Sequence, residues 1–183
     1  MAMDREQVLR AAAALLARKS TATMDEVARA AGIGRATLHR HFAGRDALVR
    51  ALEALGIQEF EAALDRAGID TGGASDGLRR LIAEMEPVAQ LLAFLVTENQ
   101  LFEGEQINEG WARLDARVSA LFRRGQEQGE FRIDLPAVWL TEALYGLLGS
   151  CAWAVMDGRV AKNDFQFMIA ELLLGGARRS VEK

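Results

Sequence analysis

Apolar residues recur at helical spacing along almost the whole chain, and this pattern restricts the fold more than any other feature. In the first segment, expected from about residue 4 to 19, Val8, Ala12 and Leu16 share one face of a helix. Segments with the same spacing lie at about 106–128, 136–156 and 163–175. Because turn-forming residues separate these segments and 183 residues can bury a core, we predict an all-α globular chain.

Two short helices separated by a glycine turn are predicted near the start of the chain. Thr23 followed by Glu26 is a capping-box pattern, so a helix should begin there. Gly32 supplies the left-handed residue that ends this helix, and the next helix carries Leu38 and Phe42 on its buried side. Such a pair forms a helix-turn-helix, whose second helix can enter the major groove of DNA.

The chain as a whole is acidic, but its charge is divided unevenly. Residues 1–50 contain nine Lys or Arg and five Asp or Glu, whereas the remainder contains thirteen and twenty-one. The local field at a contact surface decides whether nucleic acid is attracted, so the net charge of −4 does not exclude DNA binding. A basic first segment on an acidic body is compatible with DNA binding at one end, although charge also fluctuates by chance in samples this small.

The run TMDEVARAAGIGRATLHRHFAGRDALVRAL, residues 23–52, resembles the amino-terminal signature of the TetR family of transcriptional repressors. It departs from the family at Gly34, where Ser is usual, at His39, where Tyr is usual, and at Gly44, where Ser or Asn is common. The resemblance implies an all-α fold with an N-terminal three-helix helix-turn-helix DNA-binding domain, placed at 1–50. A C-terminal helical ligand-binding and dimerisation domain is placed at 51–183.

Candidate DNA contacts lie on the second helix of this motif. At about 100° per residue, Ala36, Thr37 and Arg40 face away from the buried side. Arg40 projects furthest, so base reading, typically bidentate to guanine, is its preferred role, and a solvated side chain is the alternative. Thr37 offers a methyl group to thymine and a hydroxyl to phosphate, or it bonds back to its own helix.

The resemblance adds residues around this helix. It places Arg35 near the bases, although this residue is in phase with the apolar side and must reach outward. Thr23 is a helix cap that the family also sets against the DNA backbone, and Arg45 is the backbone contact expected at the next helix. The predicted DNA-binding set is Thr23, Arg35, Ala36, Thr37, His39, Arg40, His41 and Arg45.

The chain has two histidines, His39 and His41. Because they are two positions apart on a helix, their side chains point about 200° apart. Two histidines that bind one metal ion from a helix are instead four positions apart. His41 matches the family's His before Phe, where it approaches phosphate, and a half-buried role in fixing the helix is compatible with that. Because both histidines lie in this helix, no Ser/His/acid or Cys/His constellation is possible elsewhere, so we predict no enzyme, no metal and no cofactor.

The last two helices are the expected dimer interface. Large and small residues recur at alternating four- and three-residue spacing on the first of them, which predicts close helix packing. The resemblance implies a four-helix interface built from two copies of this pair. The predicted interface residues are Trp139, Ala143, Gly146, Ser150, Trp153, Phe165, Met168 and Leu172. An intramolecular pair using the same stripes is the alternative, and the two-fold symmetry of DNA sites favours the homodimer.

A cavity for a small-molecule effector is implied by the resemblance. The residues chosen as candidates for its wall are Phe94, Glu98, Phe102, Trp111 and Tyr145. Aromatic residues at helical spacing are also ordinary core residues. Acids such as Glu84, Glu86 and Glu103 make a cationic effector conceivable, and a solvated acidic surface explains them equally well.

These features predict a cytoplasmic, ligand-responsive repressor that binds a palindromic operator on double-stranded DNA as a homodimer and is released by a small molecule. The lone Cys151 and the interrupted apolar stretch at 135–156 favour a reducing compartment and no membrane anchor. A binding or co-regulator module without operator affinity, or a transcriptional activator, is the alternative. The turn-rich stretch at 68–77 predicts an exposed loop.

Overall fold

The computed structural model describes residues 4–97 and 105–178. The helices are α1 (Arg5–Arg18), α2 (Met24–Ala30), α3 (Arg35–His41), α4 (Arg45–Ala67), α5 (Ala74–Met85), α6 (Ala89–Thr97), α7 (Glu105–Glu127), α8 (Ala137–Met156) and α9 (Phe165–Ala177), with a 3-10 turn at Lys162–Asp164. An isolated antiparallel bridge joins Phe131 to Arg178. The predicted all-α class is confirmed.

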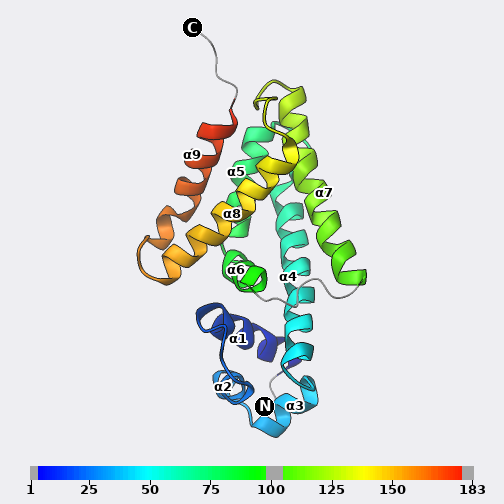
Figure 1. The fold of residues 1–183 in the computed structure, drawn as a ribbon, viewed down its shortest axis with the longest axis vertical. Coiled ribbons are helices and arrows are strands. Elements are labelled where there is room, and N and C mark those ends of the chain that lie inside the picture. Colours follow the sequence, from blue (N-terminus) through cyan, green and yellow to red (C-terminus); the bar gives the residue numbers. More distant parts are fainter. Residues whose placement is uncertain (1–3, 98–104, 179–183) are drawn as a thin grey trace.

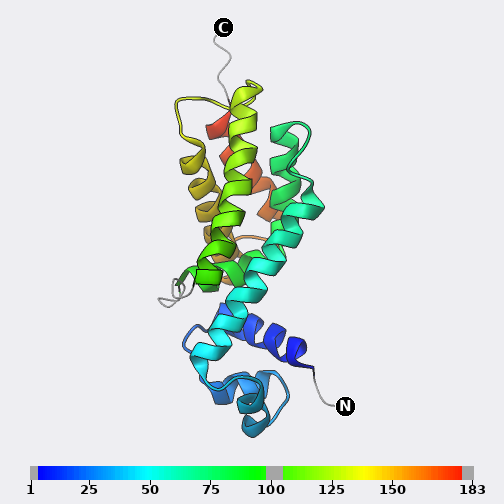
Figure 2. The same cartoon turned by 90° about the vertical axis from the view of Figure 1, so that its right-hand side faces the viewer.

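Helices α1–α3 form one end of an elongated molecule, while α5 and α7–α9 form the other (Figure 1). Helix α4 runs from the first group into the second, as both views show (Figures 1 and 2). The domain boundary placed after residue 50 therefore falls inside a continuous helix.

Two apolar clusters meet along α4 and α6. The head cluster contains buried residues of α1–α4 as far as Leu55, together with three residues of α6. Those residues are Leu91, Phe94 and Leu95. The body cluster begins at Ile57 of α4, includes Ala93 of α6, and continues through α5, α7, α8 and α9. The two ends of the molecule are therefore joined by packed side chains as well as by the backbone of α4.

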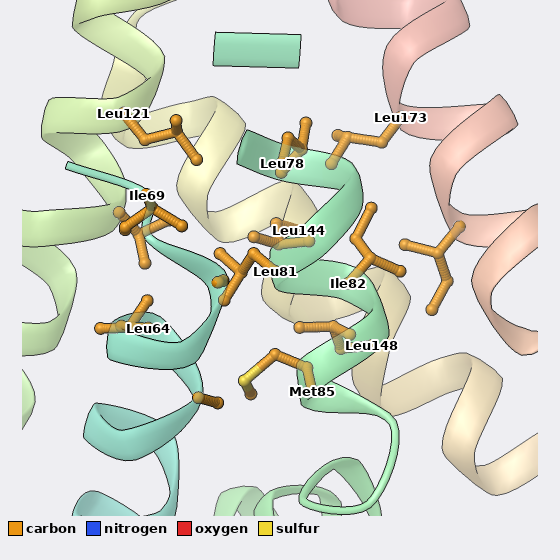
Figure 3. Packing of buried hydrophobic residues seen from close by; sticks show 14 of the residues in the cluster. Leu64, Ile69, Leu78, Leu81, Ile82, Met85, Leu121, Leu144, Leu148 and Leu173 are labelled. Carbon is orange, nitrogen blue, oxygen red and sulfur yellow. The ribbon is translucent and has the colours of Figure 1, made fainter. Parts of the chain in front are cut away.

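Helix α5 is the centre of the body cluster. Its residues Leu78, Leu81, Ile82 and Met85 have no exposed surface and follow helical spacing. Around them lie Leu64 of α4, Leu121 of α7, Leu144 and Leu148 of α8, and Leu173 of α9 (Figure 3). Burying each such side chain stabilises the fold by about 1.5–3 kcal/mol, so α5 holds the body helices together.

Local sequence signals fix the start of α2 and the turn that follows it. The Thr23 hydroxyl accepts a hydrogen bond from the Glu26 N–H at 3.3 Å, and the Glu26 carboxylate accepts one from the Thr23 N–H at 2.8 Å. Gly32 has a φ of 65°, a left-handed conformation that costs glycine little. The predicted capping box and glycine turn are confirmed.

The stretch at 68–77 is only partly a loop, which corrects the prediction of an exposed turn region. Ile69 is fully buried, and α5 already begins at Ala74. The carboxylate of Glu130 accepts hydrogen bonds from the N–H groups of Ala74 and Ser75 at 2.9 and 2.8 Å. Because this cap comes from a residue more than fifty positions away, the local sequence carries no sign of it.

Helix α8 is 20 residues long and apolar enough to cross a membrane by length and composition alone. In the structure it packs against α6, α7 and α9, and Leu140, Leu144 and Leu148 lie in the body cluster. Its apolar character is thus partly accounted for by contacts inside the protein.

Candidate nucleic-acid interface

Helix α3 has one buried and one exposed side. Leu38 and Phe42, at 0% and 2% exposure, anchor it in the head cluster. The exposed residues are Arg35, Ala36, His39 and Arg40, with Thr37 half-buried. Because α3 lies at the extreme end of the molecule (Figure 1), the exposed side can meet a duplex without displacing another described helix.

The two arginines of α3 are held by weak, solvent-exposed contacts. The Arg35 guanidinium lies 3.2 Å from the Asp25 carboxylate, with side chains 68% and 53% exposed. Arg40 donates to the Thr37 hydroxyl at 3.1 Å. Exposed ion pairs of this kind contribute about 0–1 kcal/mol, so phosphate or a base edge can replace these partners at little cost.

The side chain of Thr23 caps the start of α2. Its hydroxyl also donates to the Glu26 carboxylate at 3.1 Å, and Lys19 Nζ lies 2.7 Å from the other oxygen of that group. The hydrogen bond from Lys19, followed by that from the Thr23 N–H, lowers the pKa of Glu26 to about 2. Glu26 is therefore ionised at any pH at which the protein is expected to bind DNA, and its cap on α2 is intact.

Arg45 lies at the first residue of α4, where a DNA-backbone contact is predicted. Its guanidinium donates to the carbonyl oxygens of Ala22 at 3.1 Å and Ser20 at 2.7 Å. These bonds tie the start of α4 to the connection between α1 and α2. A phosphate contact by Arg45 stays a prediction, and removing the side chain also removes these internal bonds.

Phe42, which follows the last residue of α3, has the ring of His41 and the guanidinium of Arg5 on either side. The His41 ring, half-buried, lies 6.3 Å from the Phe42 ring, and the Arg5 guanidinium lies 5.0 Å above Phe42. Arg5 was missed by sequence reasoning because no periodic signal links it to residue 42. Among the described residues, no group of three His, Cys, Asp or Glu side chains is placed to hold a metal ion.

Five of the eight residues of the expected dimer stripe are exposed. Trp139, Met168 and Leu172 are 59%, 43% and 65% exposed, and Gly146 and Ser150 are exposed with them. Ala143 and Trp153 are half-buried. Phe165 is instead buried at 2% inside the protomer, and Phe167 at 68% takes the outward place on α9. The prediction that Phe165 is an interface residue is corrected accordingly, because α9 places this ring in the body cluster.

The predicted effector residues do not converge on one described cavity. Phe94 is buried in the head cluster, Trp111 packs against both clusters, and Tyr145 packs edge-on to Phe60 while donating to Asp115 at 2.9 Å. Burial, then the Asp115 carboxylate, raises the pKa of Tyr145. Glu98 and Phe102 lie outside the described residues.

Two surface grooves lie elsewhere. One of about 250 Å³ lies between α1, α4 and α6 and is lined by Arg10, Leu55, Glu59 and Leu91 among others. The second, of about 400 Å³, follows α8 and α9 along Trp139, Gly146 and Leu172. The second groove belongs to the expected dimer surface.

Glu53 of α4 is a buried acid that sequence reasoning missed. It is 1% exposed, and burial raises its pKa. The sequence contains a pattern that indicates this burial. Val49, Glu53 and Ile57 follow one another at four-residue spacing, on a helix whose neighbouring turns are apolar.

The chain is similar to known regulators along most of its length. The family model for bacterial regulatory proteins of the tetR family matches residues 8–52. The HTH-type transcriptional regulator NfxB of Pseudomonas aeruginosa is 32% identical over 174 residues, which are 94% of this chain and 93% of NfxB. The HTH-type transcriptional repressor LfrR of Mycolicibacterium smegmatis is 29% identical over 155 residues, which are 84% of this chain and 80% of LfrR.

The fold agrees with these similarities. The crystal structure of LfrR from Mycobacterium smegmatis in complex with proflavine matches this structure with a TM-score of 0.79 at 24% identity, covering 96% of this chain and 97% of that one. The helix-turn-helix in α2 and α3, the family match over it, and the full-length similarity to NfxB all agree. The chain belongs to the TetR family of DNA-binding transcriptional regulators.

Proposed function

We propose that this protein is a cytoplasmic repressor that binds a palindromic operator as a homodimer and is released by a small-molecule effector. Regulators of this family bind DNA, act as dimers and take small-molecule ligands. The observation that carries the proposal is the exposed side of α3 at the end of the molecule, where Arg35 and Arg40 face solvent and have only weak contacts with the residues that the structure describes.

The dimer is supported by the exposed apolar surface of α8 and α9. Trp139, Phe167 and Leu172 are each more than half exposed, an unusual exposure for such side chains. Apart from its chain neighbours and the backbone of its own helix, no described atom lies within 4 Å of a Cβ built on Gly146 or Gly175, so these positions leave room for a partner helix to approach. A two-fold pair would present two α3 helices about 34–36 Å apart to successive major grooves.

A small-molecule effector is supported by the similarity to LfrR, which has been crystallised with proflavine. Such an effector must bind the DNA-released state better than the DNA-bound state, since a ligand with equal affinity for both shifts nothing. The proposed role is regulatory, as it is for the relatives NfxB and LfrR.

Selection of binding duplexes from random DNA tests this function. The proposal expects a recovered palindrome with two half-sites about one helical turn apart, because a two-fold dimer presents two identical reading helices. Recovery of no enriched sequence, with intact folding by circular dichroism, would favour a binding module without operator affinity. An enriched site without two-fold symmetry would contradict dimeric reading.

A further inference from the structure

An ion pair between Asp25 and Arg35 joins the first turns of the two helices of the helix-turn-helix. Arg35 is the first residue of α3, and Asp25 lies in the first turn of α2. The Arg35 Nη1 donates to the Asp25 Oδ2 at 3.2 Å. Both side chains are more than half exposed, at the end of the molecule that carries α3 (Figure 1). The proposed DNA-binding surface therefore contains a carboxylate beside one of its arginines.

The Asp25 carboxylate is not part of the cap of α2. Thr23 and Glu26 complete the capping box without it. The Arg29 Nε donates to the backbone carbonyl of Asp25 at 3.4 Å, which leaves the carboxylate to Arg35. Among the described residues, the ion pair with Arg35 is thus the contact that the Asp25 side chain makes, so its effect on DNA binding should pass through Arg35.

This contact directs the Arg35 side chain and leaves most of its donors for DNA. Arg35 is three positions before the buried Leu38, so its side chain starts from the buried side of α3 and needs a partner that fixes its direction. The contact with Asp25 uses Nη1, whereas a guanidinium has five N–H donors in a planar fork. Arg35 can therefore keep Asp25 and present two further N–H groups to N7 and O6 of a guanine.

The two kinds of acceptor that DNA offers to Arg35 differ in charge. A phosphate bound to Arg35 would lie near the Asp25 carboxylate and be repelled by it, whereas a guanine edge is neutral and is not repelled. An exposed ion pair contributes little in water, but a docked duplex displaces water, and charges interact more strongly where the dielectric constant is lower. In the complex, Asp25 should therefore disfavour phosphate at Arg35 more than it disfavours a base.

We propose that Asp25 is a positioning residue that raises the specificity of DNA binding, because it holds the Arg35 guanidinium for a guanine edge and weakens its pairing with phosphate. This inference rests on the proposed operator binding and adds to it a source of discrimination between the operator and other DNA. Binding to unrelated sequences depends on phosphate contacts. Asp25 therefore lowers affinity for unrelated DNA more than affinity for the operator.

Asp25→Asn tests this role, because it removes the charge and nearly keeps the shape. Fluorescence anisotropy gives the affinities of the full-length protein for the duplex most enriched from random DNA and for a scrambled duplex of equal length, and circular dichroism checks the fold. Affinity for the scrambled duplex should rise by about three- to tenfold, and the preference for the enriched duplex should fall by at least about threefold. Asp25→Glu keeps the charge and should retain the preference within about twofold.

Two further proteins separate the role of Asp25 from a general effect of charge. In an Arg35→Ala background, Asp25→Asn should change the preference by less than about twofold, because no guanidinium is left to position. Glu6→Gln is the matched control, since Glu6 is an exposed acid of α1 that pairs with Arg10 at 2.9 Å. It removes the same charge from the same end of the molecule and should leave the preference within about twofold of the parent.

An unchanged preference in Asp25→Asn, or a fall of equal size in the Arg35→Ala background or in Glu6→Gln, would overturn the role of Asp25. Affinities for both duplexes that rise by the same factor would also overturn it, because Asp25 would then repel DNA without regard to sequence. A parent protein that binds neither duplex would overturn the proposed operator binding together with this inference. Any of the other contrary results in a parent that binds the enriched duplex would overturn this inference alone.

Discussion

Arg40 is the residue at which base reading and backbone contact can be separated. It is exposed on α3, and among the described residues its guanidinium donates only to the Thr37 hydroxyl. Arg40→Ala should weaken binding to the preferred duplex by roughly 1–3 kcal/mol and affect a scrambled duplex less, because a lost base contact matters only where the base is present. Fluorescence anisotropy with both duplexes measures this, with Arg18→Ala, an exposed arginine at the end of α1, as the control. Equal losses on the two duplexes would make Arg40 a phosphate contact.

Because the carboxyl group of Glu53 is buried, we expect the free energy of unfolding to depend on pH. Burial raises its pKa above the ordinary 4.5, so the charged form destabilises the folded state. The penalty is absent well below 4.5, grows as the pH rises from 4.5 towards the raised pKa, and is fully present above it. Glu53→Gln should therefore raise the free energy of unfolding by about 1–2 kcal/mol at neutral pH and by much less in acid. Urea unfolding at the two pH values checks this, and a gain that is the same at both would show that the carboxyl is not desolvated.

The roles of single residues were predictable from sequence only where the partner is near in the chain. The Thr23 cap followed from Glu26 three positions on, and the exposed side of α3 followed from Leu38 and Phe42. The internal bonds of Arg45 involve carbonyl groups more than twenty positions away, which no local pattern encodes.

For the helices, the spacing of apolar residues predicted the helix ranges well. It predicted less well which side of each helix faces solvent. The ends of α1, α2 and α7 agree with the pattern, since apolar spacing and capping residues act locally. The start of α5 was missed because its cap, Glu130, is distant in sequence. On α9, adjacent apolar residues left the outward face ambiguous, so Phe165 was chosen where Phe167 faces solvent.

On the surface formed by α8 and α9, the variant Gly146→Leu should weaken association of the protomers without weakening the fold. Gly146 is exposed, and beyond its own helix a Cβ there meets no described atom within 4 Å. Gly146→Leu should therefore fold at least as well as the parent, since Leu favours helix by about 1 kcal/mol over Gly. In a dimer the same side chain overpacks the interface, at a cost of about 1–3 kcal/mol.

Sedimentation velocity at low micromolar concentration measures that effect, with Ala116→Leu, an exposed alanine on α7, as the size-matched control. We expect more monomer for Gly146→Leu and an unchanged dimer for Ala116→Leu. An unchanged dimer for both would place the interface elsewhere.

For the whole molecule, α4 and α6 link the body formed by α5 and α7–α9 to the end that carries the helix-turn-helix. Both helices contribute to the head and body clusters, so the two ends are packed together and not only tethered. If an effector releases DNA, the operator must weaken effector binding by the same factor, because linkage is reciprocal. Calorimetric titration of proflavine with and without saturating operator tests this, and identical affinities in the two titrations would exclude release by that ligand.

If the exposed basic side of α3 binds a DNA operator, operator affinity must depend on salt and on sequence together. Affinity for the selected palindrome is measured by anisotropy over a range of monovalent salt, beside a scrambled duplex of equal length. Log affinity should fall linearly with log salt, with a slope of about 0.9 per phosphate contact, and the palindrome should stay preferred throughout. Affinity that does not change with salt, or that is equal for the two duplexes at every salt concentration, would contradict operator binding by α3.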